Sequence, residues 1–179
     1  MNEKFNKAIS FVLAIEGGLC EDSGGLTKYG ISQNAFPNLD IKKLTREKAM
    51  GIYHTSYWEP MHCDAFPEYI ATAIFDAAVN HGKHKAGEMF QSSVNSFLRP
   101  ENQIAVDGRI GAHTIAASDA VGKIFGYEKL YFQFVARRLA EYVYIGKKAK
   151  YEVYLRGWVN RIVKLINFNN QKGVKKCII

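Results

Sequence analysis

Cysteine is scarce in this sequence. Its three cysteines are Cys20, Cys63 and Cys177, and they lack the paired spacing of a disulfide framework or a zinc site. We therefore expect free thiols rather than a small secreted domain that folds around disulfide bonds. The histidines His81 and His84 have no third metal ligand at a recognisable spacing, so we expect no metal and no other cofactor.

Long uncharged apolar runs are also absent from the sequence. Because a membrane-spanning helix needs a run of about 18 or more apolar residues, we expect no transmembrane span and no stable membrane insertion. The apolar run at Ala8–Ile15 follows Lys4 and Lys7 as in a signal peptide, but it has no small-residue cleavage site. We interpret this run as a structural helix.

Acidic residues are outnumbered by basic ones. The 179 residues include 24 Lys and Arg against 17 Asp and Glu, which gives a net charge of +7, and 47% of the residues are hydrophobic. A chain of this length and composition can bury a core of its own, which excludes a disordered protein. Its charge favours polyanionic partners, such as nucleic acid, anionic lipid or the bacterial cell wall.

The first apolar pattern predicts a helix that ends in a carboxylate. Phe5, Ile9, Val12 and Glu16 recur at helical spacing, so they share one face of a helix. Gly17 then ends it, because glycine favours the end of a helix over its interior. Glu16 therefore continues an apolar stripe.

Other helices are marked by their start and stop signals. Thr45 is a suitable N-cap for a helix to about Trp58, and Pro67 opens an apolar helix that Gly82 ends. Further helices are expected at about Ala86–Phe97, Tyr127–Ile145 and Lys150–Phe168. The segment Leu26–Ser32 is the one plausible β region. The sequence thus predicts a mainly α fold with a small β-hairpin or loop lobe.

Two carboxylates and a hydroxyl surround the glycine-rich turn after the first helix, at Glu16, Asp22 and Thr27. Cleavage of a glycosidic bond needs one protonated and one ionised carboxyl group. An apolar face and a helix C-terminus should both raise the pKa of Glu16, whereas Asp22 should stay ionised in its polar loop, with Thr27 helping to hold a water. A glutamate before a helix end and an aspartate in an ordinary turn explain the same residues without catalysis.

A larger set of motifs extends along most of the chain. The segments are Glu16–Gly18 (Glu-Gly-Gly), Asp22–Ile31 (Asp-x-Gly-Gly-x-Thr-x-x-Gly-Ile), Phe75–Gly82 (Phe-Asp-x-Ala-Val-Asn-x-Gly), Gln91, Asp107–Thr114 (Asp-Gly-x-Ile-Gly-x-x-Thr) and Gly157–Arg161 (Gly-Trp-x-Asn-Arg). In these motifs the sequence resembles the glycoside hydrolase family 108 muramidases, which are also called secretion activator proteins or phage-type lysozymes.

The resemblance implies a lysozyme-like helical domain that hydrolyses the β-1,4 bond between N-acetylmuramic acid and N-acetylglucosamine in peptidoglycan. Glu16 corresponds to the catalytic acid, and Asp22 and Thr27 to the rest of a Glu/Asp/Thr triad. The resemblance also implies a catalytic part at residues 1–85 and a helical, predicted peptidoglycan-binding part at residues 86–179, packed as one compact unit.

Five residues are candidates for substrate binding: Tyr29, Tyr57, Trp58, Asn80 and His81. Aromatic faces at Tyr57 and Trp58 suit stacking on sugar rings, although core packing is the more frequent role of such residues. The polar atoms of Asn80 and His81 suit an acetamido group. A helix cap and a core histidine are the alternatives for these two.

Two other functions fit parts of the sequence. The first is a non-catalytic cell-wall-binding or secretion-accessory protein of the same fold. The second is a basic nucleic-acid binder, but no helix-turn-helix or RNA-binding motif supports it. We therefore expect peptidoglycan and not nucleic acid as the partner, and a monomer that acts at the cell wall or in the periplasm, as a phage endolysin or a bacterial protein.

Overall fold

The structure, a computed structural model, describes residues 2–16, 18–22 and 25–170, without the side chains of residues 19–22, 25 and 149. It confirms a mainly α fold with one small sheet. The helices are α1 (Glu3–Glu16), α2 (Arg46–Tyr53), α3 (Glu68–His81), α4 (Lys83–Asn95), α5 (Ala112–Val121), α6 (Tyr127–Gly146) and α7 (Ala149–Asn170). The strands are β1 (Leu19–Asp22), β2 (Gly25–Lys28) and β3 (Ile31–Ser32).

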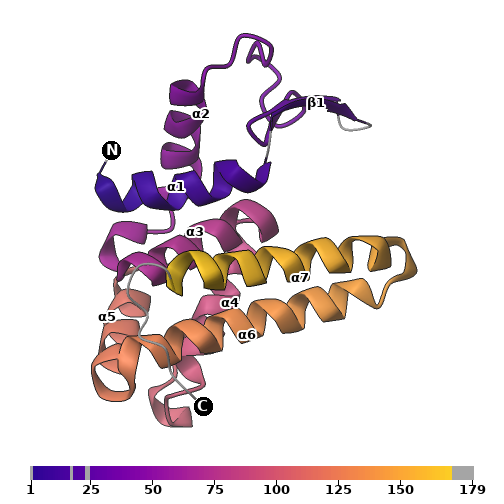
Figure 1. The fold of residues 1–179 in the computed structure, drawn as a ribbon. Coiled ribbons are helices and arrows are strands. Elements are labelled where there is room, and N and C mark those ends of the chain that lie inside the picture. Colours follow the sequence, from indigo (N-terminus) through magenta and orange to yellow (C-terminus); the bar gives the residue numbers. More distant parts are fainter. Residues whose placement is uncertain (1, 17, 23–24, 171–179) are drawn as a thin grey trace.

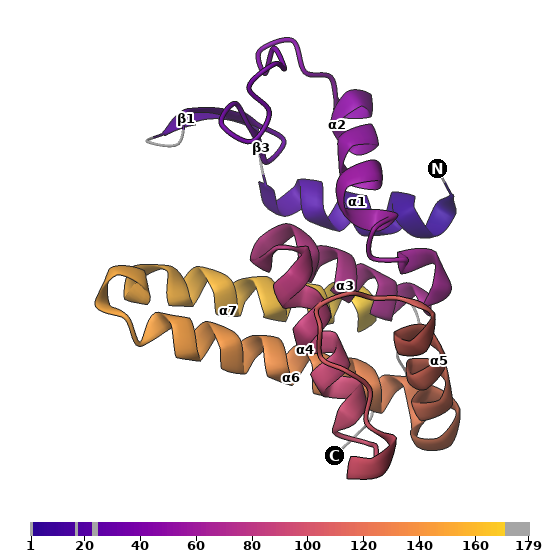
Figure 2. The ribbon, with the colours of Figure 1, turned by 180° about the vertical axis from the view of Figure 1, so that it is seen from behind.

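The central helix is α3. It lies between α1 on one side and the antiparallel α6–α7 hairpin on the other (Figures 1 and 2). All residues from Ile70 to Ala78 are buried, because this helix is apolar around its whole circumference and has neighbours on every face. Asp76 is the one charged residue in this buried stretch, and it is 0% exposed.

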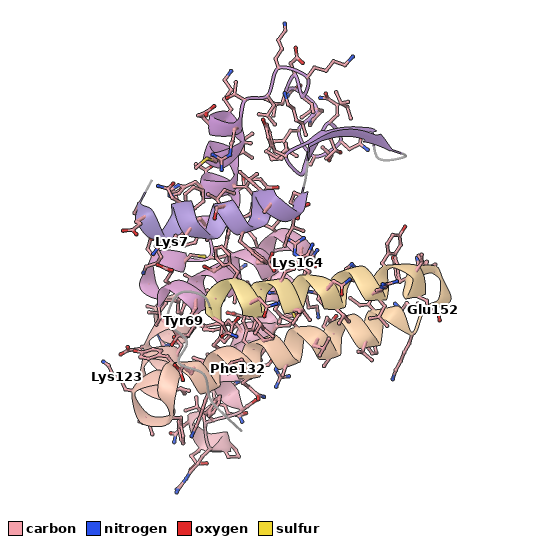
Figure 3. All side chains as sticks on the ribbon, viewed as in Figure 1. Lys7, Tyr69, Lys123, Phe132, Glu152 and Lys164 are labelled. Atoms are coloured by element: carbon pink, nitrogen blue, oxygen red, sulfur yellow. The ribbon has the colours of Figure 1, made fainter. Side chains whose placement is uncertain are left out.

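The α6–α7 hairpin extends beyond the body of the molecule on the side where α1 ends (Figure 1). Side chains fill the layer between these two helices, and Glu152 lies at the outer end of the hairpin (Figure 3). Near the body, Ile162 and Leu165 of α7 are buried in the core, whereas Val153 and Tyr154 near the outer end are exposed. The inner part of the hairpin therefore belongs to the core.

A cluster of edge-to-face aromatic rings joins α1, α3 and the segment after α2. Phe5, Trp58 and Phe75 lie with ring centroids 5.4 to 5.9 Å apart. Such pairs stabilise a core beyond the area that they bury. The cluster fixes the end of α2, which continues as a π-helical turn at His54–Trp58, against the body of the protein.

The structure confirms the predicted start of α2 and the predicted end of α3. Thr45 caps α2, since its hydroxyl accepts a hydrogen bond from the Lys48 amide at 3.3 Å. Gly82 ends α3 with φ of +83°, a conformation that residues with a Cβ avoid.

The small lobe differs in extent from the expected β region. It is an antiparallel sheet in the order β1-β2-β3, beginning at Leu19 rather than Leu26. The register places Thr27 opposite Cys20 on one side and Ser32 on the other. The lobe therefore starts directly after α1 and stands beside α2, above the end of α1 in Figure 1.

Candidate active site

Glu16 is the last residue of α1 and lies where the helical body meets the β lobe. Its side chain is 24% exposed and lines a pocket of about 150 Å³. The walls also include Tyr53 and Tyr57 from the segment after α2, and Asn80 from the end of α3. The pocket thus places a carboxyl group among hydroxyl and amide groups that can bind a sugar.

A guanidinium group from the last helix contacts this carboxyl group. Arg161 Nη1 donates a hydrogen bond to Glu16 Oε1 at 2.8 Å. The same guanidinium donates through Nε to Asp76 Oδ1 at 2.9 Å. Arg161 therefore bridges the pocket carboxylate to a buried carboxylate, and its rigid planar fork gives Glu16 a defined orientation.

The buried end of this network is Asp76. Its Oδ2 accepts a hydrogen bond from Arg138 Nη2 at 2.7 Å, and both side chains are 0% exposed. Burial by itself would raise the pKa of Asp76, but the charges and hydrogen bonds of Arg138 and Arg161 outweigh burial and lower it. For Arg161, burial works against the charged form, yet Asp76 and Glu16 raise its pKa.

The turn between β2 and β3 packs directly against Glu16. Tyr29 and Gly30 both have positive φ, at +54° and +76°. A Cβ on Gly30 would lie 2.5 Å from the Tyr53 hydroxyl oxygen and 2.9 Å from the Glu16 side chain. Tyr53 in turn donates a hydrogen bond to the Tyr29 carbonyl oxygen at 2.9 Å. Glycine at position 30 thus allows the lobe to approach Glu16.

The Tyr53 hydroxyl keeps its proton in this position. Burial raises the pKa of Tyr53, and the neighbouring Glu16 charge raises it further. The hydroxyl therefore acts as a permanent donor to the turn.

Of the other two residues predicted for catalysis, the structure describes the side chain of Thr27 alone. Thr27 is half-buried in β2 and is not part of the pocket lining. The backbone of Asp22 pairs with Gly25 at the end of the hairpin, but the Asp22 side chain lies outside the described part of the structure. The side chain of Cys20 and the whole of Cys177 also lie outside the described part. Cys63 is a buried free thiol.

The residues predicted for substrate binding fall into different environments. Tyr57 and Asn80 line the Glu16 pocket, whereas Tyr29 contributes its carbonyl oxygen to the turn. Trp58 is 0% exposed and packs in the aromatic core. Because Trp58 has no surface to offer a sugar ring, core packing is its role here. His81 lies beyond Asn80, where it packs on the Tyr142 ring.

Two further hollows adjoin the Glu16 pocket through shared residues. An apolar one of about 430 Å³ shares Ala35, Phe36 and Ile52 with it. Another of about 420 Å³ shares Asn80. Since the two larger hollows have no residue in common, the Glu16 pocket lies between them. This arrangement suits an extended ligand that has Glu16 near its middle.

The charged network was not foreseen from the sequence. Asp76 and Arg161 stand in the two motifs Phe75–Gly82 and Gly157–Arg161, but they had no assigned role, and neither did Arg138. The sequence did contain one signal of this network, which is Asp76 as a lone aspartate within an apolar helix. A buried charge requires a partner of opposite sign. The pattern does not say which basic residue that partner is.

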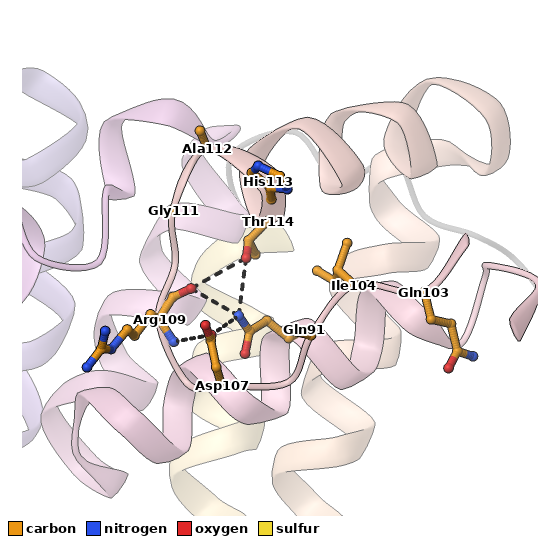
Figure 4. A pocket seen from close by; sticks show the side chains of 10 residues that line it. Gln91, Gln103, Ile104, Asp107, Arg109, Gly111, Ala112, His113 and Thr114 are labelled. Carbon is orange, nitrogen blue, oxygen red and sulfur yellow. Dashed lines mark hydrogen bonds between the residues drawn. The ribbon is translucent and has the colours of Figure 1, made fainter. Parts of the chain in front are cut away.

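The motif at Asp107–Thr114 forms a separate turn before α5, at another pocket of about 490 Å³. Figure 4 shows how Gln91 organises this turn. Its amide donates to Asp107 Oδ1 at 2.8 Å, to the Arg109 carbonyl oxygen at 3.0 Å and to the Thr114 hydroxyl at 3.2 Å. These bonds explain the motif as a structural unit of the second half.

Within residues 2–16, 18–22 and 25–170, no helix is both long and apolar enough to cross a membrane. No cluster of three or more His, Cys, Asp or Glu side chains in the same part of the chain could hold a metal ion.

The mainly α body, the small β lobe and the carboxylate between them define a lysozyme-like protein. Comparison with known families agrees with this class. Residues 9–82 match the family glycosyl hydrolase 108, and residues 85–163 match the family described as predicted peptidoglycan domain. The chain thus combines a glycosyl hydrolase 108 domain with a predicted peptidoglycan domain that follows it.

A solved structure, SagA of Brucella abortus, has a similar fold over the whole chain. The TM-score is 0.75 at 26% sequence identity, and the match covers 97% of this chain and 98% of SagA. The comparison with curated proteins gives no match.

Proposed function

We propose that the protein hydrolyses the β-1,4 bond between N-acetylmuramic acid and N-acetylglucosamine in peptidoglycan. The glycosyl hydrolase 108 domain supports a glycoside hydrolase, and the second family domain supports peptidoglycan as the partner. The observation that carries the proposal is the Glu16 carboxyl group, which is held by Arg161 at the wall of a pocket between two larger hollows.

In this proposal Glu16 donates the proton to the oxygen of the leaving sugar. General acid catalysis by a positioned carboxyl group typically contributes about 10²–10⁴-fold to a rate. The second carboxylate is Asp22, and Thr27 holds a water beside it. Both residues belong to the β hairpin that follows α1, close in sequence to Glu16.

Substrate binding in this proposal uses Tyr57 and Asn80 within the pocket, with Tyr29 at the turn and His81 beyond Asn80. Trp58 is left out, because it is buried in the core. The positive net charge of +7 favours approach to an anionic cell wall, where the enzyme acts as a monomer. Residues 1–85 form the catalytic part and residues 86–179 the peptidoglycan-binding part of one compact unit.

The test compares the wild type with Glu16→Gln, which keeps the shape of the side chain and removes its acidity. Glu101→Gln is the matched control, because Glu101 is exposed and lies outside the pocket. Loss of turbidity of purified peptidoglycan measures cleavage, and co-sedimentation measures binding.

We expect cleavage by the wild type and by Glu101→Gln, and a rate for Glu16→Gln that is lower by about 10²-fold or more, with binding retained. If all three proteins bind peptidoglycan and none cleaves it, the protein is a cell-wall-binding or accessory protein instead.

A further inference from the structure

The hollow that adjoins the Glu16 pocket at Asn80 contains charged groups that the hydrolysis proposed above does not use. It lies between the end of α3 and the α6–α7 hairpin and has a volume of about 420 Å³. Its wall contains the rings of Tyr142 and Trp158, which stack with centroids 5.3 Å apart. The Tyr142 hydroxyl donates to Asn80 Oδ1, so the same amide borders both cavities.

Two charges in this hollow are without an ionic partner. Lys148 is exposed and Glu141 half-exposed at its wall, and neither forms an ion pair with any described residue. Lys85 also lines the hollow; it forms an ion pair with Glu88 at 2.9 Å, which raises the Lys85 pKa, and the Glu141 charge, although it forms no ion pair with Lys85, contributes to raising it. Besides Lys85, whose ion pair is with Glu88, the hollow offers the ammonium of Lys148 and the carboxylate of Glu141 around an aromatic surface. This set is the complement of a ligand that carries charges of both signs.

A hydrogen-bonding atom in the same wall is also unused. His81 Nε2 is buried and has no hydrogen-bond partner among the described residues. Burial, together with the Arg138 charge, lowers the pKa of His81 to about 3, so its ring is neutral at physiological pH. A neutral imidazole has one donor and one acceptor nitrogen, and a peptide amide can satisfy either.

We propose that this hollow binds the peptide stem of peptidoglycan, with a stem carboxylate at Lys148, a stem ammonium group at Glu141 and a stem amide at His81. The inference rests on the proposed function. A muramidase places N-acetylmuramic acid next to its catalytic acid, and the stem is attached to that sugar. The hollow that shares Asn80 with the Glu16 pocket is therefore where the stem arrives. A glycan strand without peptides would leave both charges unpaired.

The direct test is binding of a synthetic lactoylated stem peptide with free carboxylates, compared with the same peptide in amidated form. Trp158 reports on the hollow by its fluorescence, while the only other tryptophan, Trp58, is buried in the core. We expect saturable binding of the free acid, and weaker binding of the amide by about fivefold, the most that one partly exposed ion pair contributes.

Substitution of Lys148 tests the same contact on the protein side. Lys148→Glu should weaken binding of the free acid to the level of the amide or below, whereas Lys147→Glu is the control, because Lys147 is also exposed but does not line the hollow. Equal binding of the two peptides, no binding, or equal effects of the two substitutions would overturn the proposal.

A cleavage assay separates this proposal from the proposed function. The quantity measured is the cleavage rate on peptide-bearing strands divided by the cleavage rate on strands that an amidase has freed of peptides. Lys148→Glu should lower this ratio by about fivefold. Lys147→Glu should leave it unchanged. An unchanged ratio overturns the stem site even if both strands are cleaved. Peptide binding without cleavage of either strand overturns the muramidase and leaves the stem site standing.

Discussion

Asp76 is the residue on which the charges around Glu16 depend. It receives hydrogen bonds from both Arg138 and Arg161 in a fully buried position. Removing one partner of a buried ion pair is costly, because the remaining charge loses its compensation without gaining water. Without Asp76, two guanidinium groups would face each other in the core.

We therefore expect Asp76→Asn to lower the free energy of unfolding by about 3–5 kcal/mol. Asp40→Asn is the control, because Asp40 pairs with Lys43 at 3.5 Å on the exposed surface, where a pair contributes about 1 kcal/mol or less. Urea unfolding measured by circular dichroism gives both values. Similar small losses for the two variants would show that the buried network does not stabilise the protein.

The same residue gives the protein a pH dependence of known sign. The pKa of Asp76 is lower in the folded protein than its ordinary value, which is about 3.9 in an unfolded chain. Its contribution to stability is therefore present above that ordinary value and is lost as the pH falls through the folded pKa. The difference in unfolding free energy between wild type and Asp76→Asn should shrink between pH 6 and pH 3. A constant difference over this range would contradict the assignment.

Arg161 holds the carboxyl group of Glu16, so we expect the proposed activity to depend on it. A lysine at this place keeps the charge but cannot bridge Glu16 and Asp76 with a planar fork. We expect Arg161→Lys to lower the cleavage rate about tenfold or more, since small displacements of a catalytic group have effects of this size. Arg156→Lys, on the exposed face of the same helix, should leave the rate unchanged. Equal rates for both variants would remove Arg161 from the site.

Among the elements, the helices with a clear apolar pattern and clear end signals were predictable. α1, α3, α6 and α7 follow their patterns to within a few residues. α5 was missed because its apolar residues do not form one stripe: Thr114, Ser118 and Val121 are its buried residues, while its alanines face outward or sit at the edge. The β lobe was placed too late, because Leu19–Asp22 forms a strand only by pairing with β2.

The turn between β2 and β3 is the element that brings the lobe to Glu16. We expect Gly30→Ala to unfold the lobe or displace it, because the new Cβ would overlap Tyr53 and Glu16 and the left-handed backbone adds about 1–2 kcal/mol. Gly51→Ala is the matched control. Its Cβ meets no atom within 4 Å, and alanine stabilises a helix by about 0.5–1 kcal/mol over glycine. The temperature of thermal unfolding and the cleavage rate should therefore both fall for Gly30→Ala and should not fall for Gly51→Ala. Full activity of Gly30→Ala would show that the turn does not shape the site.

At the scale of the whole molecule, the site joins residues that are far apart in the chain. Glu16 and Arg161 are separated by 145 positions, and they lie in the regions matched by the two different families. The sequence indicated Glu16 as a catalytic candidate from its local surroundings. It could not indicate Arg161, because no local pattern specifies which of 24 basic residues a fold will bring to a given carboxylate.

This division leads to a prediction for the separated halves. Residues 1–85 alone lack Arg138 and Arg161, and the apolar faces of α1 and α3 lose α6 and α7. We expect this fragment to be unfolded and inactive, and co-expression with residues 86–179 to restore some cleavage. Circular dichroism and the turbidity assay measure the two properties. An active fragment would show that the first half forms the site by itself.

The most direct test of the proposed hydrolysis is to identify the new chain ends that form in peptidoglycan. Digested peptidoglycan is reduced with borohydride and its fragments are analysed by mass spectrometry, for the wild type and for Glu16→Gln. If Glu16 is the acid of a muramidase, the new ends from the wild type carry reduced N-acetylmuramic acid, and the variant gives none. New ends at N-acetylglucosamine, or equal numbers of new ends from both proteins, would contradict this proposal.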